Sequence, residues 1–369
     1  MPKHKKNSNV LLIGPLSPPV TGCSVVNDLV LEKLNQENGF SVDCINRAYP
    51  EFNEAIGEFS FKKVFFYVSQ YVQAFKIFKT DITYVAIGLT FFGVLKDAPF
   101  ILFSKFIGKQ VVIHVHGNYL KTQYALLSGV KKKIFHFILS RADKGIVSSK
   151  LLKDNLTPFL KDDKIFWMPY FVEKTLKDFT EKEAVNTNGL NILYLSNLME
   201  GKGVFDVFEA LKILNENKIP YKAKIVGGVD LENKNKIFDY ISSNPNIEYS
   251  KPIRGQKKID AYLASNVFIL PTYYKMEGQP IALLEAMLTG HIIITTDHAG
   301  ILDICSEKNG YIVNKKDPRH IAKKLEYIAN NLDSFSDMMV HNHVYAKTNY
   351  KPKDFISRLG VILKNNYDM

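Results

Sequence analysis

The chain has 369 residues, which predicts two domains at about 100–200 residues each. Hydrophobic residues make up 46% and charged residues 23%, and this composition excludes disordered and fibrous proteins. Three distant cysteines (Cys23, Cys44, Cys305) exclude a disulfide framework and a zinc ribbon and favour a reducing compartment. We expect no signal peptide, because the first residues are polar, and no membrane span, because the longest uncharged stretch (82–95) is shorter than the ~20 residues required.

The net charge of +11 is concentrated in one part of the chain. Residues 61–150 carry 14 Lys and Arg residues against 3 Asp and Glu residues, which alone is a net charge of +11. In contrast, residues 181–369 carry 24 basic and 22 acidic residues. A polyanionic partner would therefore be attracted to the first half of the chain.

Strand and helix patterns alternate along the first half. Residues 9–13 predict a buried strand that ends at Gly14, and a helix with apolar residues at helical spacing follows over 24–35. Further strands are predicted at 83–88, 110–116 and 144–148. This alternation indicates a parallel sheet with helices on both faces.

The second half of the chain shows the same alternation of strand and helix patterns. A strand at 191–195 is followed by a glycine-rich turn and by an apolar-periodic helix at 204–215. Later elements are predicted as strands at 222–226, 267–270 and 291–295 and as a helix at 281–288. The two halves therefore predict an α/β fold of two doubly wound domains, joined near residues 166–174. Ligands of such folds bind in the loops at the carboxyl ends of the strands, where we expect the chemistry.

The richest segment runs from Glu277 to Gly290 and contains two glutamates eight residues apart. Pro280 suits the start of a helix, so Glu277 precedes that helix and Glu285 lies inside it. A helix N-terminus attracts a phosphate, and a carboxylate accepts hydrogen bonds from vicinal sugar or ribose hydroxyls. On spacing alone, the alternative is one glutamate that favours the helix dipole and one that is solvated.

The whole string resembles the E-x7-E motif of the retaining GT-B glycosyltransferases, glycosyltransferase family 4. The match comprises Glu277-Gly278, Leu284 to Met287 and Gly290, and it continues through 292–296, 300–304 and 309–313. The resemblance implies two Rossmann-like domains that face each other across a cleft. It also implies that Glu277 contacts the donor sugar and that Glu285 contacts the donor ribose. Three further residues of the segment are expected beside the donor: Gln279, Pro280 and Ile281.

The loop after strand 191–195 is a candidate diphosphate site. Lys202 is a point charge between Gly201 and Gly203, and glycines let a backbone approach a phosphate closely. Alternatively, Lys202 is an exposed lysine in a turn. In the family this loop holds the donor pyrophosphate with an Arg and a Lys, and Lys202 matches the lysine. Asn197 stands where the arginine usually is, so another arginine or backbone N–H groups must supply the missing charge.

Two other loop regions resemble donor-binding loops of the family. The loop 14–22, which ends at Gly22, resembles the glycine loop under the donor phosphates, and its alternative is a turn fixed by prolines. It lacks the G-x-G-x-x-G pattern, which disfavours a nicotinamide or flavin site. Gly227 and Ile253 lie in loops that we expect around the nucleotide base, although both loops also suit ordinary strand-end turns.

Two histidines end the strand at 110–116. A period of two residues places His114 and His116 on one face of the strand, but a metal site needs a third ligand and none is nearby. The family carries a histidine that faces the donor sugar at this strand end. We therefore assign that role to His116 and a structural role to His114. We expect no metal and no cofactor, with the nucleotide sugar as donor substrate.

The basic region contains two amphipathic segments, 61–79 and 122–141. In the first, Phe61, Val64, Phe65, Val68, Val72, Phe75 and Phe78 follow helical spacing, and Phe66, Tyr67 and Ile77 form a second apolar margin beside lysines. The second segment contains the run Lys131, Lys132 and Lys133. Basic amphipathic helices with aromatic residues can lie on an anionic membrane, and the alternative is two packed helices with solvated lysines. We see no nucleic-acid-binding motif.

The resemblance, together with these residues, implies a metal-independent retaining glycosyltransferase of the hexosyltransferase type. Its acceptor would be a hydroxyl of a lipid-linked or polysaccharide intermediate in bacterial cell-surface glycan synthesis. We expect it to be cytoplasmic and peripheral on the inner face of the plasma membrane. Residues 1–172 would form the acceptor-side domain, 173–350 the donor domain, and 351–369 a C-terminal helix that packs back towards the first domain. The alternatives are a sugar-nucleotide epimerase of the same fold and a non-catalytic sugar-nucleotide-binding partner subunit.

Overall fold

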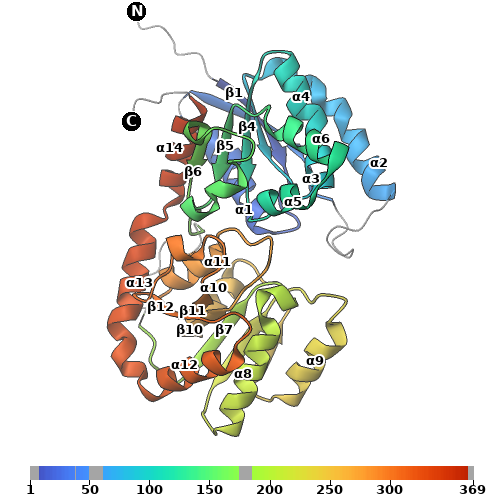
Figure 1. Ribbon diagram of the computed structural model, residues 1–369. Helices are drawn as coiled ribbons and strands as arrows, with labels where there is room; N and C mark the ends of the chain where they lie inside the picture. The colour runs from blue at the N-terminus through green and yellow to red at the C-terminus, as the bar shows by residue number, and fades with distance from the viewer. Residues whose placement is uncertain (1–7, 38, 50–60, 174–184, 365–369) are drawn as a thin grey trace, which may run out of the picture. The chain divides into compact units, whose positions relative to one another are not determined.

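The computed structural model describes residues 8–37, 39–49, 61–173 and 185–364 (Figure 1). The chain divides into two compact units. Unit 1 comprises Met1–Tyr170 together with Pro352–Met369, and unit 2 comprises Phe171–Lys351. The first division falls two residues before the predicted boundary after residue 172, and the second falls one residue after the predicted boundary at 350.

Unit 1 contains a six-stranded parallel sheet of order β2-β1-β3-β4-β5-β6. The strands are β1 (Ser8–Gly14), β2 (Phe40–Asn46), β3 (Ile82–Ala86), β4 (Gln110–Val115), β5 (Lys144–Val147) and β6 (Ile165–Trp167). The central strands are buried on both faces, as their continuous apolar runs predict. The edge strand β2, which was not predicted, has a mixed polar sequence because one side of it faces solvent.

Helices cover both faces of this sheet (Figure 1). They are α1 (Gly22–Leu34), α2 (Phe61–Ser69), α3 (Phe91–Leu95), α4 (Ala98–Phe106), α5 (Leu120–Leu126), α6 (Gly129–Leu139) and α14 (Pro352–Leu363), with 3₁₀ helices η1 (Gln70–Lys79), η2 (Lys150–Asn155) and η3 (Asp162–Lys164). Helix α1 packs against α14, whereas η1, α4, α3 and α6 form a connected second layer. Right-handed crossovers explain this division, because the chain moves in opposite directions from β1 to β2 and from β3 to β6.

Two of the sequence expectations for unit 1 are wrong in detail. The segment 61–79 is not one α-helix, because it continues from α2 into the 3₁₀ helix η1. The segment 122–141 is split into α5 and α6, because Leu127 and Ser128 adopt extended backbone conformations. Gly129 then starts α6 with a φ of +53°, a conformation that glycine adopts readily.

The C-terminal helix α14 packs within unit 1. Lys144 of β5 donates a hydrogen bond from Nζ to the carbonyl oxygen of Ile362 in the last turn of α14. Phe355, Ile356 and Leu359 of the helix are buried. Helix α14 is therefore part of the same unit as residues 1–170.

Unit 2 contains a second six-stranded parallel sheet, of order β12-β11-β10-β7-β8-β9. The strands are β7 (Asn191–Leu195), β8 (Lys222–Val226), β9 (Ile247–Ser250), β10 (Val267–Leu270), β11 (Ile292–Thr296) and β12 (Gly310–Val313). The other elements are η5 (Glu200–Lys202), α8 (Val204–Glu216), α9 (Lys234–Ser243), α10 (Gln256–Leu263), α11 (Ile281–Leu288), η6 (Ile301–Asp303), α12 (Pro318–Asn330), η7 (Leu332–Phe335) and α13 (Ser336–Asn349).

Both sheets confirm the predicted α/β, doubly wound fold class. In unit 2 the strand order changes direction between β7 and β10, which are hydrogen-bonded neighbours. The connections that leave their carboxyl ends diverge, and the space between such connections is where open α/β sheets bind ligands. The strand order therefore directs attention to the loops after β7 and β10.

Candidate functional site

Lys202 and Glu277 meet at the carboxyl ends of β7 and β10. Lys202 Nζ donates a hydrogen bond of 2.6 Å to Glu277 Oε2, and the Thr272 hydroxyl donates a second one of 3.0 Å to the same oxygen. The Glu277 side chain is 8% exposed and that of Lys202 is 16% exposed, so the ion pair is largely removed from solvent. The structure thus joins two candidate residues that lie 75 positions apart in the sequence.

Gly203 has a steric reason to be glycine. Its φ is +75°, and a Cβ atom there would lie 2.4 Å from the carbonyl oxygen of Pro271. The turn that carries Lys202 therefore approaches the end of β10 so closely that no side chain fits between them. This close approach is what brings the Lys202 ammonium to Glu277.

Glu285 lies in the second turn of α11 and is 1% exposed. Its Oε1 accepts a hydrogen bond of 2.7 Å from Lys258 Nζ, and its Oε2 accepts one of 3.0 Å from the Tyr262 hydroxyl. Lys258 also forms an ion pair of 3.1 Å with Glu173. Each carboxylate oxygen has two lone pairs, so Glu285 can still accept hydrogen bonds from a ligand hydroxyl.

In the group formed by Glu285, Lys258 and Tyr262, the positive charge of Lys258 compensates the buried negative charge of Glu285. Burial raises the pKa of Glu285, and the Lys258 ammonium opposes that shift. Burial alone would lower the pKa of Lys258, but Glu285 and Glu173 raise it above its ordinary value. Sequence reasoning missed Lys258 and Tyr262. Their spacing of four residues, which places both on one face of α10, was the available signal.

The start of α11 lies between the two glutamates in the sequence. Pro280 is its N-cap residue and Ile281 its first helical residue, and Gln279 just before them is buried. The first turn contains no acidic residue. The helix therefore presents its positive end beside Glu277, as expected for a site that receives an anion.

The loops after β7 and β8 run side by side. Leu198 N donates a hydrogen bond of 2.7 Å to the carbonyl oxygen of Gly228, and a Cβ atom on Gly227 would lie 1.8 Å from the carbonyl oxygen of Ser196. Gly227 is therefore required by packing between these loops, whatever it contacts besides. Asn197, at the position where the resemblance leads us to expect an arginine, is exposed on this edge.

Ile253 lines a cavity of about 590 Å³ at the carboxyl end of β9. Its other lining residues are Ser250, Lys251, Pro252, Arg254 and Lys257. Three of the six lining residues are cationic, and the loop leads directly into α10, which carries Lys258. The loop that we expected around the base therefore also supplies positive charge on the edge of unit 2 where Asn197 has none.

Gly22 and His116 are the candidates in unit 1. Gly22 is the first residue of α1 and follows the N-cap Thr21, whose hydroxyl accepts a hydrogen bond from Ser24 N. Apart from its chain neighbours and the backbone of α1, no described atom lies within 4 Å of the position that a Cβ would occupy on Gly22. Packing within the described residues therefore does not require a glycine there, which leaves its backbone accessible.

His114 and His116 lie on one face of β4, as predicted, and their ring centroids are 4.0 Å apart. His114 Nδ1 is hydrogen-bonded to the Tyr84 hydroxyl, and His116 Nδ1 is hydrogen-bonded to the Tyr170 hydroxyl at 2.7 Å. Burial lowers the pKa of His116 to about 3, so the ring is neutral at ordinary pH. His116 Nε2 is buried and makes no hydrogen bond within the described part of the chain. Tyr170 is a further residue that sequence reasoning did not single out.

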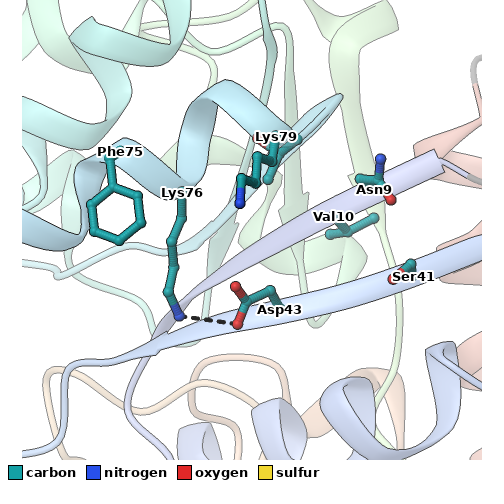
Figure 2. Close-up of a pocket in the computed structure, with 8 residues that line it drawn as sticks. Asn9, Val10, Ser41, Asp43, Phe75, Lys76 and Lys79 are labelled. Carbon is teal, nitrogen blue, oxygen red and sulfur yellow. Dashed lines mark hydrogen bonds and ion pairs between the residues drawn. The ribbon is translucent and has the colours of Figure 1, made fainter.

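Two further cavities lie away from these loops. One, of about 390 Å³, is lined by residues near the amino ends of β1 and β2 and by η1 (Figure 2). The other, of about 600 Å³, lies at the amino ends of β4, β5 and β6. Because ligands of open α/β sheets bind at carboxyl ends, neither cavity is a candidate donor site.

Neither a cluster of metal ligands nor a membrane-spanning helix occurs among the residues that the structure describes. No three His, Cys, Asp or Glu side chains gather there as metal ligands would, and the expectation of a metal-independent enzyme stays a prediction. None of the described helices has the length and apolar composition to cross a bilayer.

Comparison with known proteins adds a family match and several relatives. The family described as "Glycosyl transferases group 1" matches residues 177–342. The capsular polysaccharide biosynthesis glycosyltransferase CapM of Staphylococcus aureus is 27% identical over 203 residues, which are 53% of this chain and 52% of CapM. The amylovoran biosynthesis glycosyltransferase AmsK of Erwinia amylovora is 29% identical over 139 residues, which are 36% of this chain and 34% of AmsK. The chain thus spans about half or less of the length of these relatives.

Similar solved structures cover nearly the whole chain. Anabaena HepE in complex with UDP-glucose has a TM-score of 0.72 at 11% identity and covers 96% of this chain and 99% of its own. Sucrose-phosphate synthase from Thermosynechococcus elongatus has a TM-score of 0.74 at 15% identity and covers 97% and 98%. At such low identity the likeness concerns the fold alone, and it confirms two Rossmann-like domains of the GT-B class.

Proposed function

We propose that this protein is a glycosyltransferase that moves a hexosyl group from a nucleoside diphosphate sugar to a hydroxyl acceptor with retention of anomeric configuration. The acceptor is a lipid-linked or polysaccharide intermediate of bacterial cell-surface glycan synthesis, at the cytoplasmic face of the plasma membrane. The observation that carries the proposal is the Lys202–Glu277 pair at the β7–β10 switch point, beside the N-terminus of α11. The family match and the two biosynthetic glycosyltransferases support the reaction class.

The donor residues divide by the part of the donor that they hold. Lys202 and the N–H groups at the start of α11 bind the diphosphate, whose negative charge complements both. Glu285 accepts hydrogen bonds from the ribose hydroxyls, and Lys258 opposes the rise in its pKa that burial causes. The loops at Gly227 and Ile253 surround the base. Arg254 in the second of these loops and Lys257 in the first turn of α10 supply positive charge that Asn197 does not.

The transfer step needs no covalent enzyme intermediate. The bond between the anomeric carbon and the diphosphate oxygen breaks, and the acceptor oxygen forms its bond on the same face of the sugar. The acceptor proton passes to the leaving diphosphate. Lys202 and the α11 N-terminus stabilise the charge that develops on that group, while Glu277 and neutral His116 hold the sugar by hydrogen bonds.

The proposal is tested with purified protein, a panel of nucleotide sugars and a bacterial membrane extract. We expect transfer of labelled sugar from at least one donor to a lipid-extractable or polymeric product, and loss of that transfer in Glu277→Gln. A matched control is Glu216→Gln, which alters a glutamate at the exposed end of α8. Conversion of the nucleotide sugar without transfer would establish the epimerase alternative, and tight binding without either reaction would establish the partner-subunit alternative.

A further inference from the structure

The outer surface of unit 1 carries a continuous row of exposed apolar side chains. We call it the apolar strip: Val64, Phe65, Val68, Val72, Phe75 and Phe78, of α2 and η1, which are between 43% and 76% exposed. Single exposed apolar residues are common on protein surfaces, but contiguous apolar patches mark interaction sites. We therefore expect the apolar strip to contact a partner.

The 3₁₀ geometry of η1 aligns the second half of the strip. A 3₁₀ helix has three residues per turn, so Val72, Phe75 and Phe78 stand one above the other along the helix. The side facing inwards contains Ile77, which is buried, and Tyr71, whose ring packs at 5.5 Å from that of Phe100. The apolar strip is thus the side of the helix that the fold leaves uncovered.

Lysine contacts fix η1 in this orientation. Lys76 forms an ion pair of 3.0 Å with Asp43 of β2 and donates a hydrogen bond of 2.9 Å to the carbonyl oxygen of Cys44. Figure 2 shows Lys76 reaching from η1 to Asp43, with Phe75 beside it. Because these contacts hold the helix against the sheet edge, the exposed row is a defined surface of the folded unit.

Neighbouring helices also carry exposed apolar side chains. The Phe78 ring packs edge-on against Phe103 of α4, with 5.3 Å between ring centroids, and Phe106 at the end of α4 is 86% exposed. Helix α4 in turn contacts α6, whose Val130, Ile134 and Phe137 are exposed. Further exposed apolar side chains thus lie on α4 and α6, which belong to the same helical layer as η1.

The charge around the strip identifies the partner. Residues 62–142 contain 12 Lys and Arg residues and only two acidic residues, Asp81 and Asp97. Asp97 is buried and paired with Arg47 at 3.4 Å, so it contributes little negative charge to the surface. A second copy of this chain would bring an equally positive surface against the first, which disfavours a symmetric dimer.

We infer that the apolar strip inserts into the interfacial region of an anionic lipid bilayer, with the surrounding lysines and arginines on the headgroups. Apolar and aromatic side chains enter the boundary between headgroups and acyl chains, and cations near them are attracted to anionic lipids. The inference deepens the proposed function, on which its biological purpose rests, because an acceptor carried by a lipid would be delivered to this unit. It also locates the contact on α2 and η1 first, rather than on the lysine run 131–133.

The experiment is sedimentation of the 369-residue chain with vesicles, without any sugar donor. Phosphatidylcholine vesicles containing phosphatidylglycerol are compared with pure phosphatidylcholine vesicles. The test variant is Phe65→Ser/Phe75→Ser/Phe78→Ser, and the matched control is Leu231→Ser/Tyr327→Ser/Val344→Ser, which removes three exposed apolar side chains from unit 2. A charge variant, Lys62→Glu/Lys79→Glu, is matched by Lys212→Glu/Lys323→Glu, which changes exposed lysines of unit 2.

We expect the wild type and both controls to bind the anionic vesicles and to bind pure phosphatidylcholine at least tenfold more weakly. The apolar variant should lose at least tenfold in binding at every salt concentration. The charge variant should lose a similar amount at low salt only, because salt screens surface charge over a Debye length of about 8–10 Å. Wild-type vesicle binding by the apolar variant would overturn the inference. So would a wild-type dimer that this variant converts to a monomer while vesicle binding is unchanged.

Binding of UDP, measured in parallel by calorimetry, separates this inference from the proposed function. UDP binding depends mainly on the candidate residues of unit 2, and all four variants should keep it. Unchanged circular dichroism and thermal unfolding of the same variants show that unit 1 is also folded. Vesicle binding without binding of any nucleotide sugar would contradict the proposed function and leave the lipid contact standing. Nucleotide binding and sugar transfer without vesicle binding would contradict the lipid contact and leave the proposed function standing.

Discussion

Two buried glutamates of unit 2 are each paired with a lysine, and the two pairs are distinct. Glu277 is paired with Lys202, which the proposed function also assigns to the diphosphate. Glu285 is paired with Lys258, which has a second carboxylate partner in Glu173. Removing one member of a buried ion pair leaves the other uncompensated, so each substitution here affects its partner as well as any ligand.

Lys202→Met should weaken binding of the nucleotide sugar by about ten- to a hundredfold, because a hydrogen bond to a charged group contributes about 1.5–3 kcal/mol. Transfer should fall with it, since the ammonium meets the diphosphate before and during the reaction. Calorimetry with the donor measures the loss, and Lys212→Met at an exposed position of α8 is the control. Unchanged donor affinity would remove Lys202 from the site.

Glu285→Gln should weaken binding of the nucleoside diphosphate itself, because the ribose loses a charged acceptor. Glu277→Gln should instead depress turnover more than it affects binding of the diphosphate, because Glu277 contacts the sugar. The two variants serve as controls for each other in the same calorimetric and kinetic assays. Equal binding of the diphosphate by Glu285→Gln and the wild type would refute the ribose assignment.

Lys258→Met should make binding of the nucleoside diphosphate dependent on pH. Burial already raises the pKa of Glu285, and loss of the opposing ammonium raises it further, so the carboxyl group becomes protonated as pH falls. Binding should then be weaker at mildly acidic than at mildly alkaline pH, whereas the wild type shows a smaller change. A pH profile of Lys258→Met parallel to that of the wild type would show that Lys258 does not control the charge of Glu285.

A buried histidine makes the stability of unit 2 sensitive to acid. Burial lowers the pKa of His291 to about 4, while its unfolded-state value is near 6.5. Below the unfolded pKa the unfolded chain binds a proton that the folded chain rejects, so stability falls by about 1.4 kcal/mol per pH unit between these values. Denaturant unfolding over this pH range measures the slope. His291→Asn should reduce the number of protons taken up on unfolding by about one. An identical slope in the variant would show that His291 does not cause the acid sensitivity.

At the scale of elements, the helical spacing of apolar residues did not show which side of the helix is buried. The residues from Val64 to Phe78 follow helical spacing, as core-facing rows do, yet the structure places them outward. The margin that includes Ile77 packs inward instead. On the inward side Tyr71 packs against Phe100 and Lys76 contacts Asp43 of β2, and both partners lie about 30 positions away in the sequence.

Helix α14 offers a prediction at the same scale. Lys144→Met should destabilise unit 1 by about 1–3 kcal/mol, because the buried carbonyl of Ile362 loses its charged donor. Hydrogen exchange should become faster in residues 352–363 before it changes elsewhere. Lys150→Met, in η2, is a control in unit 1 on an exposed lysine. Equal protection of α14 in Lys144→Met and the wild type would contradict this anchoring role.

At the scale of the whole molecule, the candidate residues are divided between two units. Those for the nucleotide lie in unit 2, and Gly22 and His116 lie in unit 1. UDP alone should therefore slow hydrogen exchange mainly around 196–203, 226–228, 252–258 and 277–285. A nucleotide sugar that the protein accepts should add protection near residue 116, since His116 is assigned to the sugar. If both ligands protected the same segments, the role of His116 would be wrong.

The sequence by itself determined the α/β class, the strands at 191–195, 222–226 and 267–270, and the helix at 281–288 with its two glutamates. These features are local, because apolar runs, turn residues and helix starts are written within a few neighbouring positions. Tertiary structure alone decided that Lys202 meets Glu277, that Lys258 compensates Glu285, and that the apolar strip faces outward. The order of the strands in each sheet determines which of these distant residues become neighbours. No local sequence pattern encodes the order in which parallel strands pair.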